Sequence, residues 1–445
     1  MPKKISLYWI VFVAVNGGFL FGLNMAGISG AVNSIQFSFN LSDGSLGTVV
    51  SILTLGCLFG ALFTGHFADK YGRKKIMLFT SVLFAISALG CALSPSMLLL
   101  SISRVIAGIA VGAVSVVGPM YISEIAPASQ RGTLVSFNQF AIVIGILLAY
   151  VFDYFLIDKV DGWRYMLAIP FVFSIVFLIL LSTSLPESPR WLLSKRKKEK
   201  AMNVLKRIGG ENYAQQEMQS MEQSINLETN TEKVSFIEIF QGKTGKVVLL
   251  GTLLAAFQQI TGINAVVNYA PVIFEKTGVG GDTALLQSML VGLVNFLATL
   301  VALWLVDKKG RKTLLLWGAA GMSLALGYLS YAFAFNGSST SILIALLAYI
   351  AFFAASFAPV MWVVTSEMFP NRVRGLALSF STAISWLFTF LTVQFSPYIL
   401  NQFGGAVLFG FFGLFSLLAF LFVKIWIPET KGKTLEQIEK EILKN

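Results

Sequence analysis

Charged residues are scarce in this chain of 445 residues: Asp, Glu, Lys and Arg make up 12%, about half the roughly 25% of ordinary soluble domains. There is one histidine, and two cysteines, Cys57 and Cys91, are too few for a disulfide framework. No His or Cys cluster is available to bind a metal, whereas 56% of the residues are hydrophobic. These shortages argue against a soluble enzyme and against a metal centre or other cofactor.

Apolar runs near the roughly 20 residues needed to cross a bilayer recur along the chain. The expected spans are residues 6–32, 46–67, 76–94, 97–122, 132–156, 165–184, 247–274, 284–306, 313–335, 341–366, 375–400 and 404–427. One long polar segment separates the sixth span from the seventh, and its composition predicts helices outside the membrane. The sequence therefore predicts an all-α membrane protein with twelve transmembrane helices. Its parts are a six-helix half at 1–185, linker helices at 186–246, a second six-helix half at 247–427 and a tail at 428–445.

Basic residues gather on one side of the predicted spans. The outer loops keep only Lys159, Arg164 and Lys276 if the N-terminus is cytoplasmic. Because Lys and Arg near span ends resist translocation, both termini and the linker are expected in the cytoplasm, with the protein in the cell membrane. The net charge is 33 − 22 = +11, which in a soluble chain would suggest a nucleic-acid partner. Here the basic residues lie at span ends, so the expected partner is the lipid bilayer and no nucleic acid is expected. The protein is expected to act as a monomer.

The two halves repeat one another in sequence. Residues 123–137 and 366–380 share seven identities at a constant offset of 243, and residues 69–74 match 307–312 in the corresponding inner loops. Six-span repeats in the same orientation are typical of transporters whose binding site lies between the halves.

Four motifs carry a family resemblance: GHFADKYGRK at 65–74, PESPR at 186–190, QQITGIN at 258–264 and PETKG at 428–432. In this order and spacing they resemble the sugar porter family of the major facilitator superfamily, which includes bacterial xylose and glucose porters and facilitative glucose transporters. The resemblance covers nearly the whole chain. It implies the major facilitator fold and transport of a monosaccharide, a hexose or a pentose, by alternating access.

Amide side chains gather around Gly262 in the seventh span. Each amide both donates and accepts, which suits a neutral polyol, and Gly262 would permit local unwinding. The alternative is amide hydrogen bonding that only joins helices. By resemblance, the expected sugar contacts are Gln139, Gln258, Gln259, Asn264, Asn295 and Trp362. Asn268 and Trp386 are added to this set. Relatives often have tyrosine at the position of Asn268, and they have glutamine or asparagine at the position of Ser385, just before the matching Trp386. For Trp362, which follows the potential helix breaker Pro359, core packing is the alternative.

Proton coupling needs a group that gains and loses charge inside the bundle, and no carboxylate is expected near the bilayer midplane. Proton-coupled bacterial members of the family typically have aspartate where this chain has Asn24, whereas facilitative members have asparagine. Arg104, the lone base within a span, matches the arginine that would face this position, and we expect it to bind amides or carbonyls. The pattern favours uniport. Asp153, expected near the outer end of the fifth span, keeps proton-coupled symport open.

Charged residues also mark the inner ends of the spans. The candidate inner-gate charges are Asp69, Arg73, Glu124, Arg131, Glu187, Arg190, Asp307, Arg311, Glu367, Arg374 and Glu429. The resemblance implies that opposite charges from the two halves pair when the site opens outward and separate when the halves rock. Anchoring of helix ends at the membrane interface is the simpler alternative.

Two other classes of protein find less support. A membrane-embedded enzyme would need a nucleophile, a metal set or an acid–base pair inside the bundle. A sugar-sensing receptor on a transporter scaffold would need a signalling tail, whereas only a short charged helix near residues 435–444 is expected.

Overall fold

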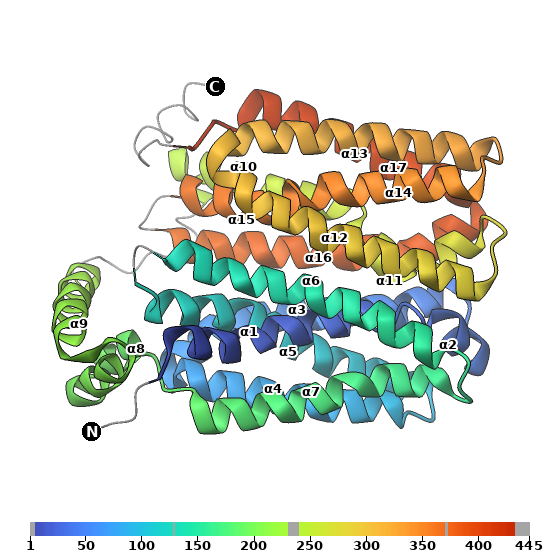
Figure 1. Ribbon diagram of the computed structural model, residues 1–445. Coiled ribbons are helices and arrows are strands. Elements are labelled where there is room, and N and C mark those ends of the chain that lie inside the picture. Colours follow the sequence, from blue (N-terminus) through green and yellow to red (C-terminus); the bar gives the residue numbers. More distant parts are fainter. Residues whose placement is uncertain (1–4, 128–129, 230–239, 370–372, 432–445) are drawn as a thin grey trace.

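The computed structural model describes residues 5–127, 130–229, 240–369 and 373–431. Within these ranges every regular element is a helix (Figure 1). Twelve stretches of the described chain are long and apolar enough to cross a membrane. The prediction of an all-α protein with twelve spans is confirmed.

The first half comprises α1 (Leu7–Ala26), α2 (Val32–Ser38), α3 (Asp43–Tyr71), α4 (Arg73–Ala92), α5 (Met97–Ile125), α6 (Arg131–Leu156) and α7 (Gly162–Ser184). The expected span 6–32 was too long, because α1 ends at Ala26 and a turn leads to the short α2. Gly27 and Gly30, both poor helix formers, lie in this turn. The Gly30 N–H donates to the carboxylate of Asp153 on α6 (2.9 Å) instead of to a helix carbonyl.

The second half comprises α10 (Gly242–Ile260), α11 (Ile263–Glu275), α12 (Gly281–Lys309), α13 (Arg311–Ala334), α14 (Ser339–Ala354), α15 (Phe357–Met368), α16 (Arg374–Gln402) and α17 (Gly404–Trp426). Two of its membrane-spanning stretches, Thr244–Glu275 and Ser339–Met368, are each built from two helices. Figure 1 shows the two halves side by side, with their helices nearly parallel.

Between the halves in sequence lie α8 (Pro189–Ser194) and α9 (Lys198–Thr229), which pack Trp191 of α8 against a small apolar core on α9. Both lie at one end of the bundle, at the left of Figure 1, which we name the linker end; the opposite end is the far end. The Ile5 N–H donates to the Arg207 carbonyl of α9 (2.9 Å), so the described chain also begins at the linker end. Residues 230–239 of the predicted linker and the predicted tail helix at 435–444 lie outside the described residues.

Small residues allow the helices of the first half to approach closely. Gly56 and Gly60 of α3 face Gly108 and Gly112 of α5, and a Cβ on any of them would overlap a backbone atom of the partner helix. Such contacts between backbones are a common means of helix association in membranes.

Candidate functional site

Two spans of the second half are interrupted near their middle. Between α10 and α11, Gly262 has φ +93°, a left-handed conformation that glycine adopts without strain. Between α14 and α15, Ser356 is non-helical (φ −135°, ψ −83°). Pro359 follows in the first turn of α15, where its missing N–H costs little. The unwinding predicted at Gly262 is confirmed, and the break near Pro359 falls three residues before it.

These breaks bring three predicted amides into one hydrogen-bonded chain. Gln258 Nε2 donates to the Phe357 carbonyl at the start of α15 (2.9 Å), and Gln258 Oε1 accepts from Gln259 Nε2 (3.0 Å). Gln259 Oε1 accepts in turn from Asn264 Nδ2 (2.7 Å), while Asn268 Nδ2 donates to the Asn264 carbonyl (2.7 Å). Two of these bonds also join helices: Gln258 links α10 to α15, and the Asn264–Gln259 bond links α11 to α10 across the break at Gly262. The remaining N–H groups and lone pairs of these amides suit neutral hydroxyl groups.

The other predicted sugar residues lie on four further helices: Gln139 on α6, Asn295 on α12, Trp362 on α15 and Trp386 on α16. No hydrogen bond within the described part of the chain links them to the amide chain. Asn295 and Trp386 are buried, whereas Trp362 is 38% exposed, which argues against core packing for this residue.

An aromatic contact between the halves lies beside these residues. The rings of Trp386 on α16 and Phe21 on α1 are tilted, with centroids 5.8 Å apart. The sequence analysis did not predict Phe21 as a site residue. Its position one helical turn before Asn24 was the signal that could have indicated it.

The predicted coupling residues meet inside the first half. Asn24 is 7% exposed and donates Nδ2 to the Leu20 carbonyl (2.9 Å). The buried Arg104 donates Nη1 to the Asn24 carbonyl (3.2 Å) and Nη2 to the Val50 carbonyl (3.1 Å), as expected for a base bound to carbonyls. Among the residues that the structure describes, backbone dipoles rather than a carboxylate thus hold this guanidinium.

Asp153 lies one turn before the end of α6, towards the far end as expected, but its burial was not predicted. It is 1% exposed, and its Oδ2 accepts from the Gly30 N–H. No ion pair of the described residues includes it. A carboxylate buried in this way is costly in its charged form, which makes Asp153 a functional candidate.

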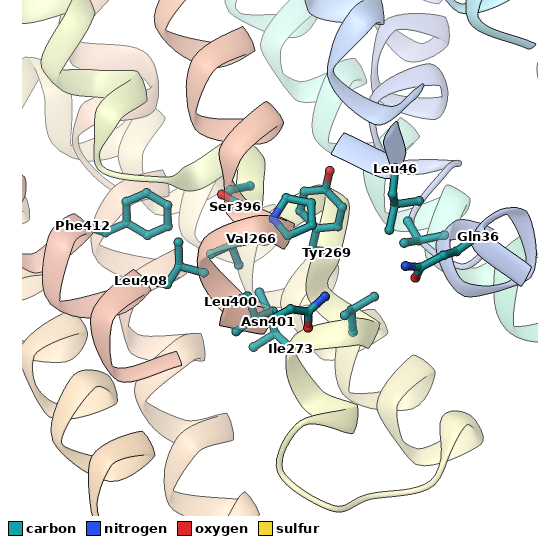
Figure 2. Close-up of a pocket in the computed structure, with 14 residues that line it drawn as sticks. Gln36, Leu46, Val266, Tyr269, Ile273, Ser396, Leu400, Asn401, Leu408 and Phe412 are labelled. Atoms are coloured by element: carbon teal, nitrogen blue, oxygen red, sulfur yellow. The ribbon is translucent and has the colours of Figure 1, made fainter. Parts of the chain in front are cut away.

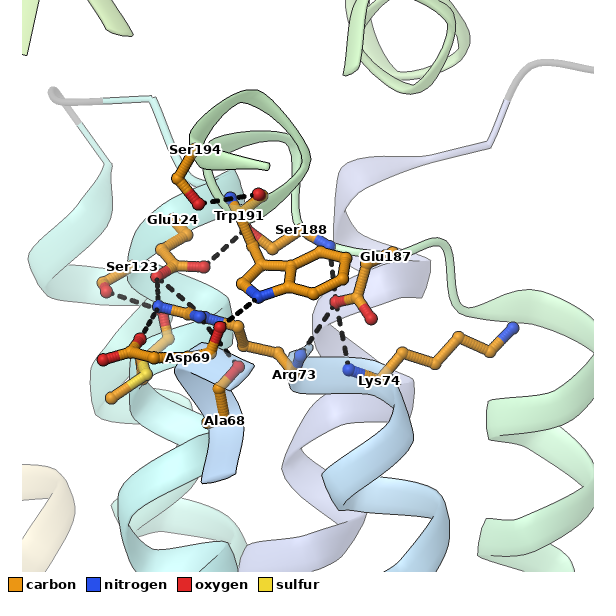
Figure 3. A network of polar contacts seen from close by, with 11 residues as sticks. Ala68, Asp69, Arg73, Lys74, Ser123, Glu124, Glu187, Ser188, Trp191 and Ser194 are labelled. Atoms are coloured by element: carbon orange, nitrogen blue, oxygen red, sulfur yellow. Dashed lines mark hydrogen bonds and ion pairs between the residues drawn. The ribbon is translucent and has the colours of Figure 1, made fainter. Parts of the chain in front are cut away.

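Charged residues form a network at the linker end of the first half (Figure 3). Arg73, the first residue of α4, pairs with Glu124 of α5 (Nη2–Oε1, 2.7 Å) and with Asp69 of α3 (3.0 Å). Glu187, just before α8, accepts from the backbone N–H groups of Arg73 and Lys74 (2.9 and 3.1 Å). Because the first N–H groups of a helix lack partners within it, Glu187 caps α4. The network holds α3, α4, α5 and α8 together.

The second half repeats this network with equivalent residues. Arg311 pairs with Glu367 (Nη2–Oε1, 3.2 Å). Glu429 accepts from the backbone N–H groups of Arg311 and Lys312 (2.9 and 3.1 Å), and the Thr430 hydroxyl donates to Glu367. The sequence repeat thus corresponds to a repeated arrangement in space.

The remaining predicted gate charges lie around these networks. Arg374 donates Nε to the Phe369 carbonyl (3.2 Å), Arg131 begins α6 in an exposed position, and Arg190 lies in α8. The side chain of Asp307 is outside the described set. Because the ion pairs of each network join residues of one half, pairing across the inner gate remains a prediction for a different conformation.

At the far end, by contrast, hydrogen bonds join the two halves. Gln394 of α16 contacts three groups on α3: its Oε1 accepts from Ser51 Oγ (2.7 Å), and its Nε2 donates to the Gly44 carbonyl (3.1 Å) and to Thr48 Oγ1 (3.2 Å). Both ends of this amide are therefore bonded across the interface. Gln394 was not predicted as a functional residue.

Two carboxylates reinforce the far-end interface. Asp43 of α3 accepts from Asn401 Nδ2 of α16 (2.9 Å), and Glu275 of α11 accepts from Asn33 Nδ2 of α2 (2.6 Å). Both bonds use a charged acceptor and a neutral donor from the opposite half. The described conformation is thus closed at the far end.

A pocket lies at this far-end interface (Figure 2). Residues of both halves line it, among them Val32, Leu46, Tyr269 and Leu400. None of its 14 lining residues is a predicted sugar residue. The pocket therefore uses other side chains than the candidate substrate site, although both include residues of α11.

Comparison with known proteins identifies relatives of this chain. The family model described as sugar (and other) transporter matches residues 10–442. The D-xylose-proton symporter of Escherichia coli (strain K12) is 38% identical over 473 residues, covering 97% of this chain and 95% of that protein. The glucose transporter GlcP of Staphylococcus epidermidis is 37% identical, covering 99% and 98%. The partially occluded inward open conformation of the xylose transporter XylE from E. coli matches with a TM-score of 0.86 at 36% identity, covering 96% and 99%.

The twelve spans and the match to XylE show a multi-pass membrane protein with the major facilitator fold. Its family and its relatives are transporters, so the chain is a transporter and not an enzyme. The extent of the match then specifies the family. The chain belongs to the sugar transporter family, and the resemblance to sugar porters is confirmed.

Proposed function

We propose that the protein is a facilitated-diffusion uniporter that carries a monosaccharide, a hexose or a pentose, by alternating access. The observation that carries this proposal is the amide chain of Gln258, Gln259 and Asn264, oriented by two helix breaks. Neutral amides offer both donors and acceptors to sugar hydroxyls, whereas burying charged groups there would cost more. The names of the relatives, a xylose symporter and a glucose transporter, support both sugar sizes.

The proposed sugar contacts come from both halves of the bundle. Gln139 belongs to the first half, and Gln259, Asn295, Trp362 and Trp386 belong to the second. A sugar held by both halves binds more tightly when they close around it, so that binding energy favours the occluded state and promotes rocking.

Uniport is proposed because Asn24 cannot titrate and its neighbour Arg104 is bonded to carbonyl groups. Neither residue changes charge during a transport cycle. Sugar flux would then follow the sugar gradient alone, in either direction.

The burial of Asp153 favours a second candidate function, proton-coupled symport. Asp153 would be neutral while the far end is closed, and would ionise when water reaches it from the far side. In that case the coupling acid lies on α6 instead of at the position of Asn24.

The proposed orientation places the linker end in the cytoplasm, following the distribution of Lys and Arg. The described conformation would then be open to the cytoplasm. We further propose that charges of the two networks, such as Arg73 and Glu367, exchange partners across the halves when the linker end closes, and that one chain in the bilayer is the working unit.

The test is exchange of radiolabelled glucose, xylose and a small panel of other sugars in proteoliposomes, with and without a pH gradient. Uniport predicts equal exchange in both conditions and no accumulation driven by protons. Accumulation in the wild type that is lost in Asp153→Asn would support symport instead. Asn24→Asp is the complementary variant, since it restores a titratable group at the family's coupling position. No exchange of any sugar would contradict both candidates.

A further inference from the structure

The carbonyl oxygen of Val267 on α11 lacks its usual helical donor. In a helix this carbonyl would accept from residue 271, which is Pro271 and has no N–H. Tyr269, between them, is non-helical (φ −116°, ψ 16°). Val267 is 4% exposed, so its carbonyl needs a partner inside the protein.

Tyr150 of the other half supplies that partner. Its hydroxyl donates to the Val267 carbonyl at 2.7 Å, and the side chain, on α6, is fully buried. The ring passes α12 at Gly292, where a Cβ would overlap it. The sequence thus has a hydroxyl donor on one half, an unpaired carbonyl on the other, and a glycine that leaves room for the ring between them.

The bonded carbonyl lies on the stretch of α11 that carries two amides of the candidate substrate site. Val267 directly precedes Asn268 and lies three residues after Asn264, so the bond from Tyr150 connects the first half to the part of α11 that carries these amides.

We propose that Tyr150 is a positioning residue for transport, because its hydroxyl holds α11 against the first half while the far end is closed. This inference rests on the proposed alternating-access function. With the far end closed, the Val267 carbonyl is dry and depends on Tyr150. With the far end open, water can hydrate the carbonyl. Loss of the hydroxyl therefore penalises the closed state selectively and shifts the population towards the far-end-open state.

The test compares Tyr150→Phe with Tyr349→Phe. Tyr349 is also fully buried, and its hydroxyl donates to the Thr261 carbonyl at 2.9 Å. Tyr349 and Thr261 both belong to the second half, so this bond does not cross the interface. The two variants thus remove the same group from equally buried sites, and only one bond crosses the interface. The reporter is Val32→Cys, which is conservative in volume at a side chain 1% exposed in the far-end pocket.

The measured quantity is the rate at which a membrane-impermeant maleimide labels Val32→Cys in proteoliposomes without sugar. Loss of one buried hydrogen bond predicts labelling about tenfold faster in Tyr150→Phe. We expect Tyr349→Phe to keep the original rate despite a similar loss of thermal stability. Equal labelling rates in the two variants would overturn the proposal.

If Tyr150→Phe does not fold, Gly292→Ala displaces the same ring, and an unchanged labelling rate there would equally count against it. Labelling needs no sugar, so its outcome is separate from that of the transport assay. Faster labelling in Tyr150→Phe without sugar flux in the wild type would support the role of Tyr150 and contradict the sugar function. Sugar exchange in the wild type with unchanged labelling in Tyr150→Phe would support the sugar function and contradict the role of Tyr150.

Discussion

Replacing Gln259 with alanine should abolish most sugar binding while the protein still inserts and folds. Gln259 is the central member of the amide chain, since it donates to Gln258 at 3.0 Å and accepts from Asn264 at 2.7 Å. Gln259→Ala removes one proposed sugar ligand and also releases the amides on either side of it. The carbonyl bond that anchors Gln258 to α15 stays in place.

The expected size of this effect follows from the number of bonds lost. A hydrogen bond contributes about 0.5–1.5 kcal/mol net, so two bonds from one amide to sugar hydroxyls correspond to about 1–3 kcal/mol. This lowers affinity roughly 5- to 150-fold, at about 1.4 kcal/mol per factor of ten. The fold should lose less, because the bond from Gln258 that joins α10 to α15 does not involve Gln259.

Isothermal calorimetry with glucose and xylose on detergent-purified protein measures this change, and thermal unfolding measures stability. Gln287→Ala is the matched control, since Gln287 has the same side chain and the same 9% exposed fraction on α12, outside the predicted site. We expect the control to bind sugar normally. Normal sugar affinity in Gln259→Ala, or equal losses in both variants, would refute the proposed site.

Three further predictions concern the frame around the site. Glu187→Gln and Glu429→Gln each remove the charge that caps a helix, so each should lower the free energy of unfolding by about 1–2 kcal/mol in chemical denaturation, and a wild-type value would contradict the capping role. Gln394→Leu removes three hydrogen bonds between the halves, each of about 0.5–1.5 kcal/mol, and should speed maleimide labelling of Val32→Cys more than tenfold. An unchanged rate would show that Gln394 does not hold the far end closed. Gly262→Ala forces a Cβ into a left-handed conformation at the α10–α11 break and should lower both Tm and sugar affinity; wild-type values would mean that the break tolerates a side chain.

Several features of the structure could be predicted because they depend on local composition. The twelve spans follow from apolar length, and the break at Gly262 follows from a glycine among amides in an apolar run. The sequence repeat anticipated that Arg73 and Arg311 would have equivalent surroundings, as their matching partners Glu124 and Glu367 demonstrate.

Other features depend on contacts between distant segments. Nothing near Tyr150 in the sequence indicates that Pro271, more than a hundred residues later, frees a carbonyl for its hydroxyl. The burial of Asp153 depends on how the turn after α1 packs against α6. The ion pairs of Arg73 with Glu124 and of Arg311 with Glu367 join residues 51 and 56 positions apart in one half, whereas the sequence suggested pairs across the halves.

Simultaneous recording of sugar uptake and internal pH in proteoliposomes tests the central claim most directly. With a sugar gradient and no initial pH difference, a uniporter moves sugar while the internal pH stays constant. We predict this result for the wild type with at least one monosaccharide. A pH change that accompanies sugar entry, and that disappears in Asp153→Asn, would contradict uniport and identify the protein as a proton-coupled symporter.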